Sequence, residues 1–292
     1  MTIKIAEHYG LCFGVRDAIA EAERLARRGP LTILGELVHN PVVRNTLDQL
    51  GAQTARLEDV GQAGTSQVMI TAHGASDGAR TAWKAAGFGV SDGTCPLVRH
   101  AHEQLKLLVQ LGYAPVIIGQ RGHVEVNGLS GDFPEAAILD SEAGLEALPD
   151  ADRLGVISQT TQPIDRVQRL VAAIRVARPT AEVRFVDTVC QPTKNRQNAL
   201  RKLLSECDTM VVVGGRNSNN TLQLVAAAEV AGLRTIHIER EEELVRAWFA
   251  DSENVGLTAG TSTLKETVAA VHARLEEFAH RSASGSPQST AP

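Results

Sequence analysis

The chain has 292 residues, a formal net charge of −5, and 43% hydrophobic and 22% charged residues, which is typical of an ordinary globular protein. The negative charge argues against a general nucleic-acid surface, and an aromatic content of 3% argues against a platform on which bases stack. No apolar run approaches the ~18 residues of a membrane span, and charges near the start argue against a signal peptide. We therefore expect a cytoplasmic protein that contacts neither nucleic acid nor membrane.

Short apolar runs alternate with segments of helical periodicity along the sequence. Several of the apolar runs are continuous, which is typical of strands in parallel sheets that are covered on both faces. Helical spacing fills segments between them, such as 98–111, 165–177, 222–231 and 264–278. The pattern predicts an α/β fold with mostly parallel strands. The predicted strands are 3–6, 31–34, 67–70, 115–118, 137–139, 154–157, 183–186, 209–213, 234–237 and 254–257.

Cys95 lies where a predicted strand gives way to a predicted helix. The run 83–90 before it is small and apolar, and we interpret it as a buried strand. Thr94 is the expected N-cap of the helix, and Pro96 suits its first turn. Because a helix N-terminus favours negative charge, this position stabilises the thiolate, which is the form that binds metals.

The same order of strand, cysteine and helix occurs at Cys12 and Cys190. A pattern that occurs three times predicts three similar units rather than one long sheet. Cys207 differs, because it follows a helix and precedes an apolar run, so we interpret it as a small buried residue. The predicted units are 13–95, 96–189 and 190–280 completed by 1–12, and the Ser-, Pro- and Gly-rich segment 281–292 is predicted to be disordered.

Six loops that follow predicted strands are rich in His, Ser, Thr, Asn and Gly. In open α/β sheets, ligands bind at the carboxyl ends of the strands. One such Ser, Thr or Asn is more often a helix cap, and one such histidine is more often a satisfied buried residue. Three of the nine histidines share this topological position, which favours a functional site: His39, His73 and His123.

Two kinds of chemistry are indicated by these loops. Ser218, Asn220 and Ser262 lie at predicted helix starts, where hydroxyl, amide and backbone N–H groups together suit a diphosphate. The ATP-binding phosphate loop and the dinucleotide fingerprint after the first strand are both missing from the sequence. Glu125 follows His123 in a Gly-rich loop, and apolar neighbours would raise its pKa and keep a proton available. The alternative for Glu125 is a solvated loop carboxylate.

Three cysteines at separate helix N-termini suit an iron–sulfur cluster that lacks a fourth protein ligand. Such a cluster leaves one iron open to substrate. Zinc held by three cysteines and one histidine is an alternative, although the close cysteine pairs of structural zinc sites are missing. A single nucleophilic cysteine would not explain three equivalent positions. A non-catalytic iron–sulfur sensor and a zinc-dependent hydrolase are further alternatives, but a sensor needs neither a diphosphate cradle nor Glu125.

Ten motifs, taken in order over residues 1–280, resemble the family of 4-hydroxy-3-methylbut-2-enyl diphosphate reductases, which complete the methylerythritol phosphate route to isoprenoids. The motifs are Gly10-Leu-Cys-Phe-Gly-Val15, Val38-His-Asn-Pro41, Ala72-His-Gly74, Thr94-Cys-Pro-Leu-Val98, Gly122-His-x-Glu-Val126, Ser158-Gln-Thr-Thr161, Asp187-Thr-Val-Cys190, Asn195-Arg-Gln197, Asn217-Ser-x-Asn-Thr221 and Thr258-Ala-Gly-x-Ser262.

The resemblance implies a trefoil of three α/β domains around a central 4Fe–4S cluster. It also implies a reductive dehydroxylation with two electrons and two protons, giving isopentenyl and dimethylallyl diphosphates, in a monomer served by a ferredoxin or flavodoxin. Cys12, Cys95 and Cys190 would ligate three irons, and the substrate hydroxyl would reach the fourth. Glu125 would deliver a proton, with His123 and Thr160 positioning the substrate and relaying protons. The residues that match diphosphate-binding positions are His39, His73, Ser218, Asn219, Asn220 and Ser262.

Four positions depart from the family pattern. Val124 stands where proline is usual, and Asn219 stands where serine is common. Thr261 and Leu264 replace the usual small residue and proline around Ser262. These departures concern the rigidity of loops and the contacts to the diphosphate, and they leave the cluster ligands and Glu125 in place.

Overall fold

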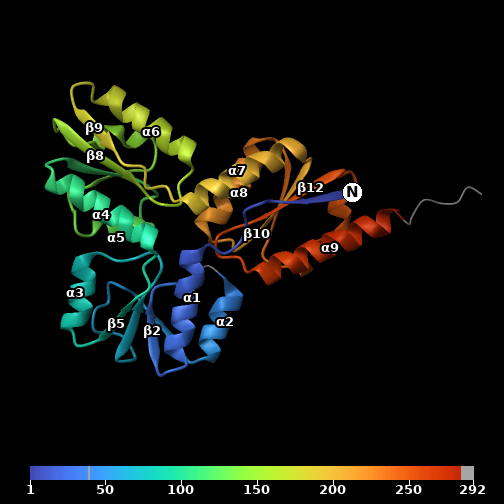
Figure 1. The fold of residues 1–292 in the computed structure, drawn as a ribbon, viewed down its shortest axis with the longest axis horizontal. Helices are drawn as coiled ribbons and strands as arrows, with labels where there is room; N and C mark the ends of the chain where they lie inside the picture. The colour runs from blue at the N-terminus through green and yellow to red at the C-terminus, as the bar shows by residue number, and fades with distance from the viewer. Residues whose placement is uncertain (39, 284–292) are drawn as a thin grey trace, which may run out of the picture. The chain divides into compact units, whose positions relative to one another are not determined.

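The computed structural model describes residues 1–38 and 40–283. Within them, the strands form three four-stranded sheets in which every pairing is parallel (Figure 1). Helices lie beside each sheet, so the predicted α/β class with parallel sheets is confirmed. All ten predicted strands are present, with bounds that differ by at most two residues at either end.

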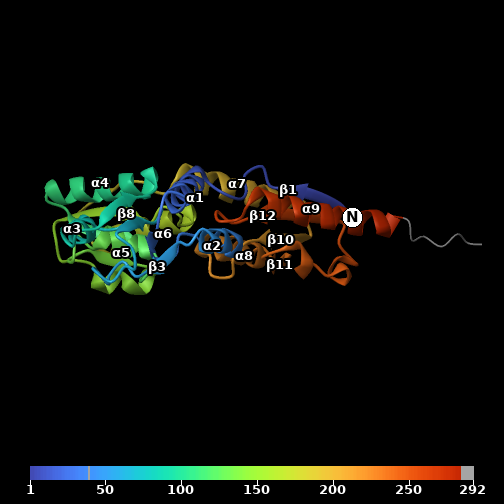
Figure 2. The same ribbon diagram turned by 90° about the horizontal axis from the view of Figure 1, so that it is seen from below.

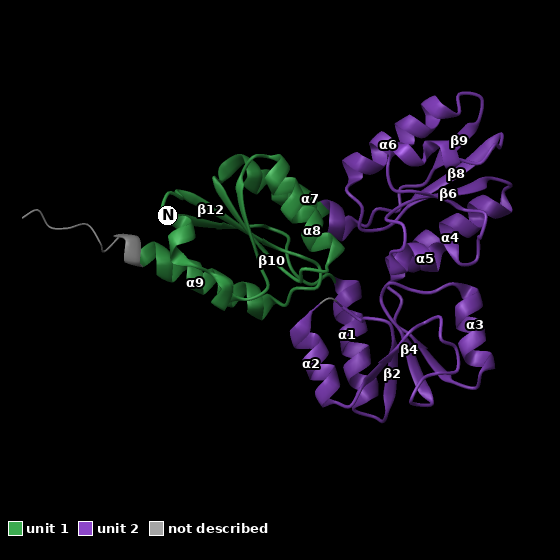
Figure 3. Ribbon diagram, turned by 180° about the vertical axis from the view of Figure 1, so that it is seen from behind, with its two compact units in different colours: residues 1–12, 195–292 green, residues 13–194 purple. Residues whose placement is uncertain are grey.

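The first sheet has the order β3-β2-β4-β5. Its central strands β2 and β4 are almost entirely buried, whereas the edge strands β3 and β5 are partly exposed. Helices α1 and α2 lie on one side of the sheet and α3 on the other (Figure 3). The bounds are α1 Phe13–Ala26, β2 Leu31–Leu34, α2 Pro41–Gln49, β3 Gln53–Ala55, β4 Gln67–Ile70, α3 Asp77–Ala85 and β5 Gly89–Asp92.

The prediction that 83–90 forms a buried strand before Cys95 is wrong. Trp83 belongs to α3, where it is fully buried, and its indole N–H donates to the carbonyl of Leu57. Its ring packs edge-on against Phe88, with 4.9 Å between the ring centroids. The strand before Cys95 is the short edge strand β5, which begins only at Gly89. The apolar run therefore marks the end of a helix that packs into the core.

The second sheet has the order β7-β6-β8-β9, and apolar clusters cover both of its faces. Val116 and Ile118 of β6 pack in the same cluster as Ile174 of α6, whereas Ile117 packs with Leu105 of α4. A strand covered on both faces needs no polar alternation, which explains the continuous apolar run. The bounds are α4 Pro96–Gln110, β6 Ala114–Ile118, α5 Val124–Ser130, β7 Ala137–Leu139, the 3₁₀ helix Glu142–Ala147, β8 Arg153–Ser158, α6 Ile164–Ala177 and β9 Glu182–Phe185.

The third sheet has the order β1-β12-β10-β11. Strand β1 from the chain start pairs with β12, beside which it lies in Figure 2. Cys207 is partly buried against the cluster that includes Met210 and Val212, and burial raises the pKa of its thiol. The bounds are β1 Thr2–Ile5, α7 Gln191–Glu206, β10 Thr209–Val213, α8 Asn219–Val230, β11 Arg234–Ile238, the 3₁₀ helices Glu241–Glu243 and Arg246–Phe249, β12 Asn254–Ala259 and α9 Lys265–Ala283.

The chain divides into two compact units, residues 1–12 with 195–292 and residues 13–194 (Figure 3). The second unit contains the first two sheets, and the first unit contains the third. The three predicted domain boundaries stay a prediction. Helix α9 continues to Ala283, and the rest of the segment predicted to be disordered lies outside the described residues. Among the helices of the described residues, none is long and apolar enough to cross a membrane.

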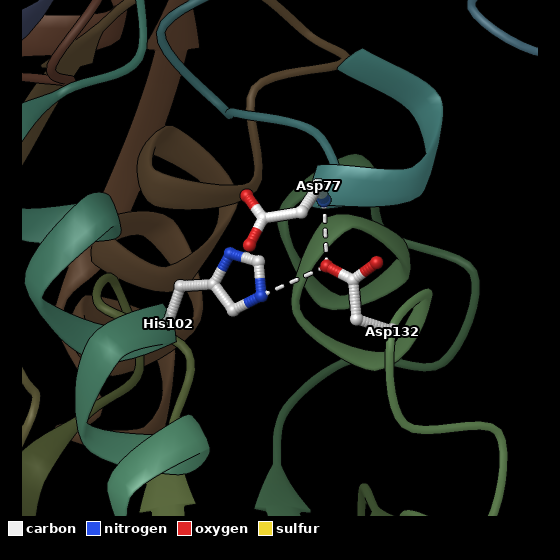
Figure 4. A group of neighbouring side chains, drawn as sticks. All are labelled: Asp77, His102 and Asp132. Atoms are coloured by element: carbon white, nitrogen blue, oxygen red, sulfur yellow. Dashed lines mark hydrogen bonds and ion pairs between the residues drawn. The ribbon is translucent and has the colours of Figure 1, made fainter. Parts of the chain in front are cut away.

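Asp132 connects three elements of the 13–194 unit. Its carboxylate oxygens accept the backbone N–H groups of Asp77 (2.6 Å) and Gly78 (2.9 Å) at the start of α3. His102 Nε2 of α4 lies 3.1 Å from the same carboxylate (Figure 4). Together, Asp77, His102 and Asp132 offer ligand atoms within 4.8 Å of one another.

These three side chains form a structural cap rather than a metal centre. Asp77 already pairs with Arg80 (3.2 Å) and Lys106 (3.6 Å), and both cations would repel a divalent ion. The carboxylate of Asp132 neutralises the partial positive charge at the start of α3 and satisfies two N–H groups that have no partner within the helix.

Replacing Asp132 by alanine is expected to lower the free energy of unfolding by about 1–2 kcal/mol, because two helix N–H groups lose their acceptor. The urea unfolding transition of the variant, compared with wild type, measures this loss. Asp150→Ala is the matched control, because Asp150 is exposed and caps no helix among the described residues. Equal midpoints for the Asp132 and Asp150 variants would show that the cap does not stabilise the fold.

Candidate active site

Pro96 opens α4, as predicted, and Cys95 is the N-cap of this helix. The prediction that Thr94 is the N-cap is wrong. The Thr94 hydroxyl and N–H both bond the carboxylate of Asp92, and Arg80 donates to the same hydroxyl at 3.1 Å. Thr94 therefore fixes the loop that carries Cys95, while the Cys95 side chain makes no capping hydrogen bond.

The backbone holds Cys95 and Cys190 in the same way. The N–H of Cys95 donates to the carbonyl of Ala72 at 3.0 Å, and the N–H of Cys190 donates to the carbonyl of Thr160 at 2.9 Å. In both cases the carbonyl belongs to the loop that follows a neighbouring strand of the same sheet. Both cysteines are partly exposed, and each directly precedes a helix.

Glu125 lies in the first turn of α5, not in a loop, and only 2% of its surface is exposed. Its Oε1 accepts the backbone N–H of Thr160 at 2.6 Å. Burial raises the pKa of Glu125 to about 7, because loss of solvent penalises the carboxylate more than the hydrogen bonds from Thr160 favour it. The expected burial is present, and a solvated loop carboxylate is excluded.

His123 is the N-cap of α5, and its Nδ1 accepts the backbone N–H of Glu125 at 3.1 Å. A proton on the neutral ring therefore sits at Nε2. The rings of His123 and His73 meet edge-on, with 5.7 Å between centroids and 81° between planes. His39, the remaining predicted histidine, lies outside the described residues.

The contacts in the 13–194 unit join the predicted residues into one continuous series. Each step is a hydrogen bond, a ring contact or a peptide bond, and the series runs from one cysteine to the other. The structure thus brings a proton carrier and two histidines, from the segments after β4 and β6, into one series with two thiols, from the loops after β5 and β9. In order, the residues are Cys95, Ala72, His73, His123, Glu125, Thr160 and Cys190.

Cys12 lies in the other unit, at its boundary and directly before α1. The loop before it is held by its backbone, because Gly10 N–H donates to Ala259 at 3.2 Å and Leu11 N–H donates to Thr263 at 3.0 Å. Gly10 has a φ of +70°, which favours glycine. Cys12 is therefore tied to the loop that follows β12.

Arg196 lies in the motif Asn195-Arg-Gln197, but its sequence pattern does not predict a role for it. Its side chain is 5% exposed, and its Nη2 donates to the carbonyl of Gly10 at 2.5 Å. A guanidinium is almost never buried without a specific role, so it fixes the loop that carries Cys12. A sequence shows the arginine but not its burial.

The predicted diphosphate residues of the same unit meet at the start of α8. Ser218 is the N-cap, and its Oγ accepts the N–H of Thr221 at 3.4 Å. Asn220 Oδ1 accepts the N–H of Thr261 at 3.0 Å, next to the buried Ser262. This bond joins the first turn of α8 to the loop that precedes α9.

Asn219 is the first residue of α8, and its Nδ2 is buried with no hydrogen-bond partner among the residues that the structure describes. The two N–H bonds of the amide add to the N–H groups that a helix start leaves without partners. An anion at this position would satisfy both sets of donors.

None of the four cysteines, all within the described residues, is in a disulfide. Cys12, Cys95 and Cys190 are partly exposed and each directly precedes a helix, a position that favours the thiolate form that binds metals. The donor set of three thiols at helix starts therefore fits an iron–sulfur cluster.

The family described as LytB protein matches residues 3–276 of the chain. The 4-hydroxy-3-methylbut-2-enyl diphosphate reductase of Aquifex aeolicus is 34% identical over 282 residues, which cover 94% of this chain and 96% of that protein. The structure of the Plasmodium falciparum E-1-hydroxy-2-methyl-but-2-enyl-4-diphosphate reductase matches with a TM-score of 0.85 and 25% identity, over 96% of this chain and 87% of the other.

A second solved structure, of the (E)-4-hydroxy-3-methyl-but-2-enyl diphosphate reductase described as the terminal enzyme of the non-mevalonate pathway, matches with a TM-score of 0.69 and 33% identity. It covers 95% of this chain and 100% of the other. The matches extend over nearly the whole chain, so they include every described residue of the site. The chain belongs to the LytB family of 4-hydroxy-3-methylbut-2-enyl diphosphate reductases.

Proposed function

We propose that this chain reduces 4-hydroxy-3-methylbut-2-enyl diphosphate to isopentenyl and dimethylallyl diphosphates. The reaction breaks the C–O bond of an allylic hydroxyl, consumes two electrons and two protons, and releases water. The observation that carries the proposal is Glu125, a fully buried acid whose partner Thr160 also accepts the N–H of Cys190. Family membership, shown by the match over residues 3–276, supplies the reaction class.

Cys12, Cys95 and Cys190 are the proposed ligands of a 4Fe–4S cluster. Such a cluster would supply the two electrons, received one at a time from a ferredoxin or a flavodoxin. Four cysteines that form no disulfide fit a reducing compartment such as the cytoplasm. We infer that the enzyme works as a monomer, because the proposed ligands and substrate contacts all come from one chain.

Glu125 is the proposed proton donor. A pKa of about 7 keeps a large fraction of the carboxyl groups protonated near neutral pH, while the conjugate base is stable enough to form. The hydrogen bond from the Thr160 N–H to Oε1 fixes the carboxyl and stabilises the anion that remains after transfer. His123 and Thr160, which both contact Glu125, are proposed to position the substrate beside it.

The diphosphate is proposed to bind through neutral donors and histidines. Ser218 and the buried amide of Asn219 lie at the start of α8, where helix N–H groups favour an anion. The proposed contacts are His39, His73, Ser218, Asn219, Asn220 and Ser262.

Glu125→Gln tests the proton donor. The amide has nearly the same shape and keeps an oxygen that accepts from Thr160, but it has no transferable proton. We expect at least a 10²-fold fall in kcat with a chemical reductant, and unchanged iron content and substrate affinity. Glu135→Gln, on an exposed glutamate, is the matched control. Turnover of the Glu125 variant at the wild-type rate would exclude Glu125 as the donor.

The raised pKa of Glu125 also predicts how stability depends on pH. Between pH 4.5 and about 7 the unfolded chain loses this proton while the folded chain keeps it, so the folded state loses stability as the pH rises. The full cost above pH 7 is about 3 kcal/mol. Glutamine has no such cost, so Glu125→Gln should gain stability relative to wild type across this window.

Urea unfolding of the cluster-free proteins below and above this window measures the effect. The same comparison for Glu135→Gln, at an exposed glutamate, is the control. A constant difference between Glu125→Gln and wild type at every pH would show that burial does not raise the pKa of Glu125.

Serine substitutions distinguish the three proposed ligands from Cys207. Cys12→Ser, Cys95→Ser and Cys190→Ser should each lower the iron and sulfide bound per chain after anaerobic reconstitution, because a hydroxyl is a poor ligand for iron. Cys207→Ser should retain wild-type iron content, because Cys207 packs in the core of the third sheet. Loss of iron in the Cys207 variant, or full retention in any of the other three, would overturn the ligand assignment.

A further inference from the structure

We propose that Gly14 is a positioning residue for the thiol of Cys95, because the missing side chain at position 14 provides the space that the sulfur occupies. The proposal rests on the proposed function, in which Cys95 is a cluster ligand. It concerns only residues of the 13–194 unit.

The close approach is visible in the geometry of Gly14. A Cβ built on Gly14 would come closer to Cys95 Sγ than the 3.0 Å that real Cβ atoms keep. It would also lie 3.1 Å from the Cβ of Cys95 and 3.8 Å from its Cα. The whole Cys95 side chain therefore rests against the backbone of Gly14.

Backbone conformation does not explain the glycine. Gly14 is the second residue of α1 and is absent from the glycines with positive φ, so any residue could adopt its conformation. Glycine within a helix costs roughly 0.5–1 kcal/mol relative to alanine. Alanine would thus favour α1 itself, and the contact with Cys95 is what opposes it.

The backbone of Cys95 has little freedom to yield. Its N–H is bonded to Ala72, and the preceding Thr94 is held by Asp92 and Arg80. A methyl group at position 14 would therefore be accommodated mainly by rotation of the Cys95 side chain to another rotamer. Ligands must be held within roughly 0.5 Å of their productive position, and a rotamer change moves the sulfur by more than that.

Gly14 follows Cys12 by two residues in the chain. One short segment therefore carries one proposed ligand and makes room for another. Gly14 lies in the motif Gly10-Leu-Cys-Phe-Gly-Val15. Its specific role in this motif is to fix the position of a sulfur from a distant part of the sequence.

Gly14→Ala tests the proposal, with Gly78→Ala as its matched control. Gly78 is also the second residue of its helix, α3, but a Cβ there would meet no atom closer than 3.4 Å. After anaerobic reconstitution we expect Gly14→Ala to bind the cluster about 10-fold to 100-fold less tightly, as for other residues that support metal ligands. Iron and sulfide per chain during titration with a chelator report this change. The control should match wild type.

A second measurement needs neither cluster nor turnover. In the cluster-free protein, Gly14→Ala should lower the urea midpoint when Cys95 is present. In a Cys95→Ala background, Gly14→Ala should lower the urea midpoint less, or raise this midpoint, because the sulfur that the new methyl group would displace is gone. A merely structural glycine would give the same effect in both backgrounds.

The possible outcomes separate the two proposals. If wild type binds no iron–sulfur cluster, the proposed function fails, whatever the double-mutant cycle shows. If wild type binds the cluster and Gly14→Ala binds it equally well, the role of Gly14 is refuted while the proposed function stands. Additive effects of the two substitutions on the urea midpoint would also refute the role of Gly14.

Discussion

The site of the 13–194 unit depends on the backbone of one residue, Thr160. Its N–H donates to the buried carboxyl of Glu125 at 2.6 Å, and its carbonyl accepts the N–H of Cys190 at 2.9 Å. The same residue therefore fixes the proposed acid and one proposed cluster ligand. Because both bonds use the backbone, they depend on the course of the chain after β8 and not on the type of side chain at position 160. The acid and the thiol cannot move independently while this loop keeps its conformation.

Parallel sheets explain why such distant residues meet. All three sheets are parallel, so the loops after neighbouring strands emerge at the same edge. The N–H of a cysteine at the start of one helix then finds a carbonyl in the loop after the adjacent strand, as Cys95 does with Ala72. The repetition of this bond at Cys190 shows that the local arrangement is a property of the fold. The chemistry is added by the side chains that the loops carry.

The sequence predicted the parallel sheets better than it predicted local detail. Strong patterns gave ten strands, but β3 was missed because it has only three residues and is mostly exposed. The run 83–90 was misassigned because apolar periodicity does not distinguish a buried helix end from a short strand. The predictions that Thr94 is a helix N-cap and that Glu125 lies in a loop were wrong for a related reason. Hydrogen bonds to Asp92 and the start of α5 depend on contacts that a sequence does not display.

Valine at position 124, where the family usually has proline, has little effect on how the start of α5 and Glu125 are held in place. Val124 is the first residue of α5, where proline is favoured mainly because its fixed φ suits a helix start and its missing N–H is not needed. Valine keeps an N–H that the helix does not use, and 44% of its surface is exposed, so it adds little to the core. The helix start is instead held by His123, whose Nδ1 accepts the N–H of Glu125. The proposed acid is thus fixed at its backbone by His123 and at its carboxyl by Thr160, and neither bond requires proline at position 124.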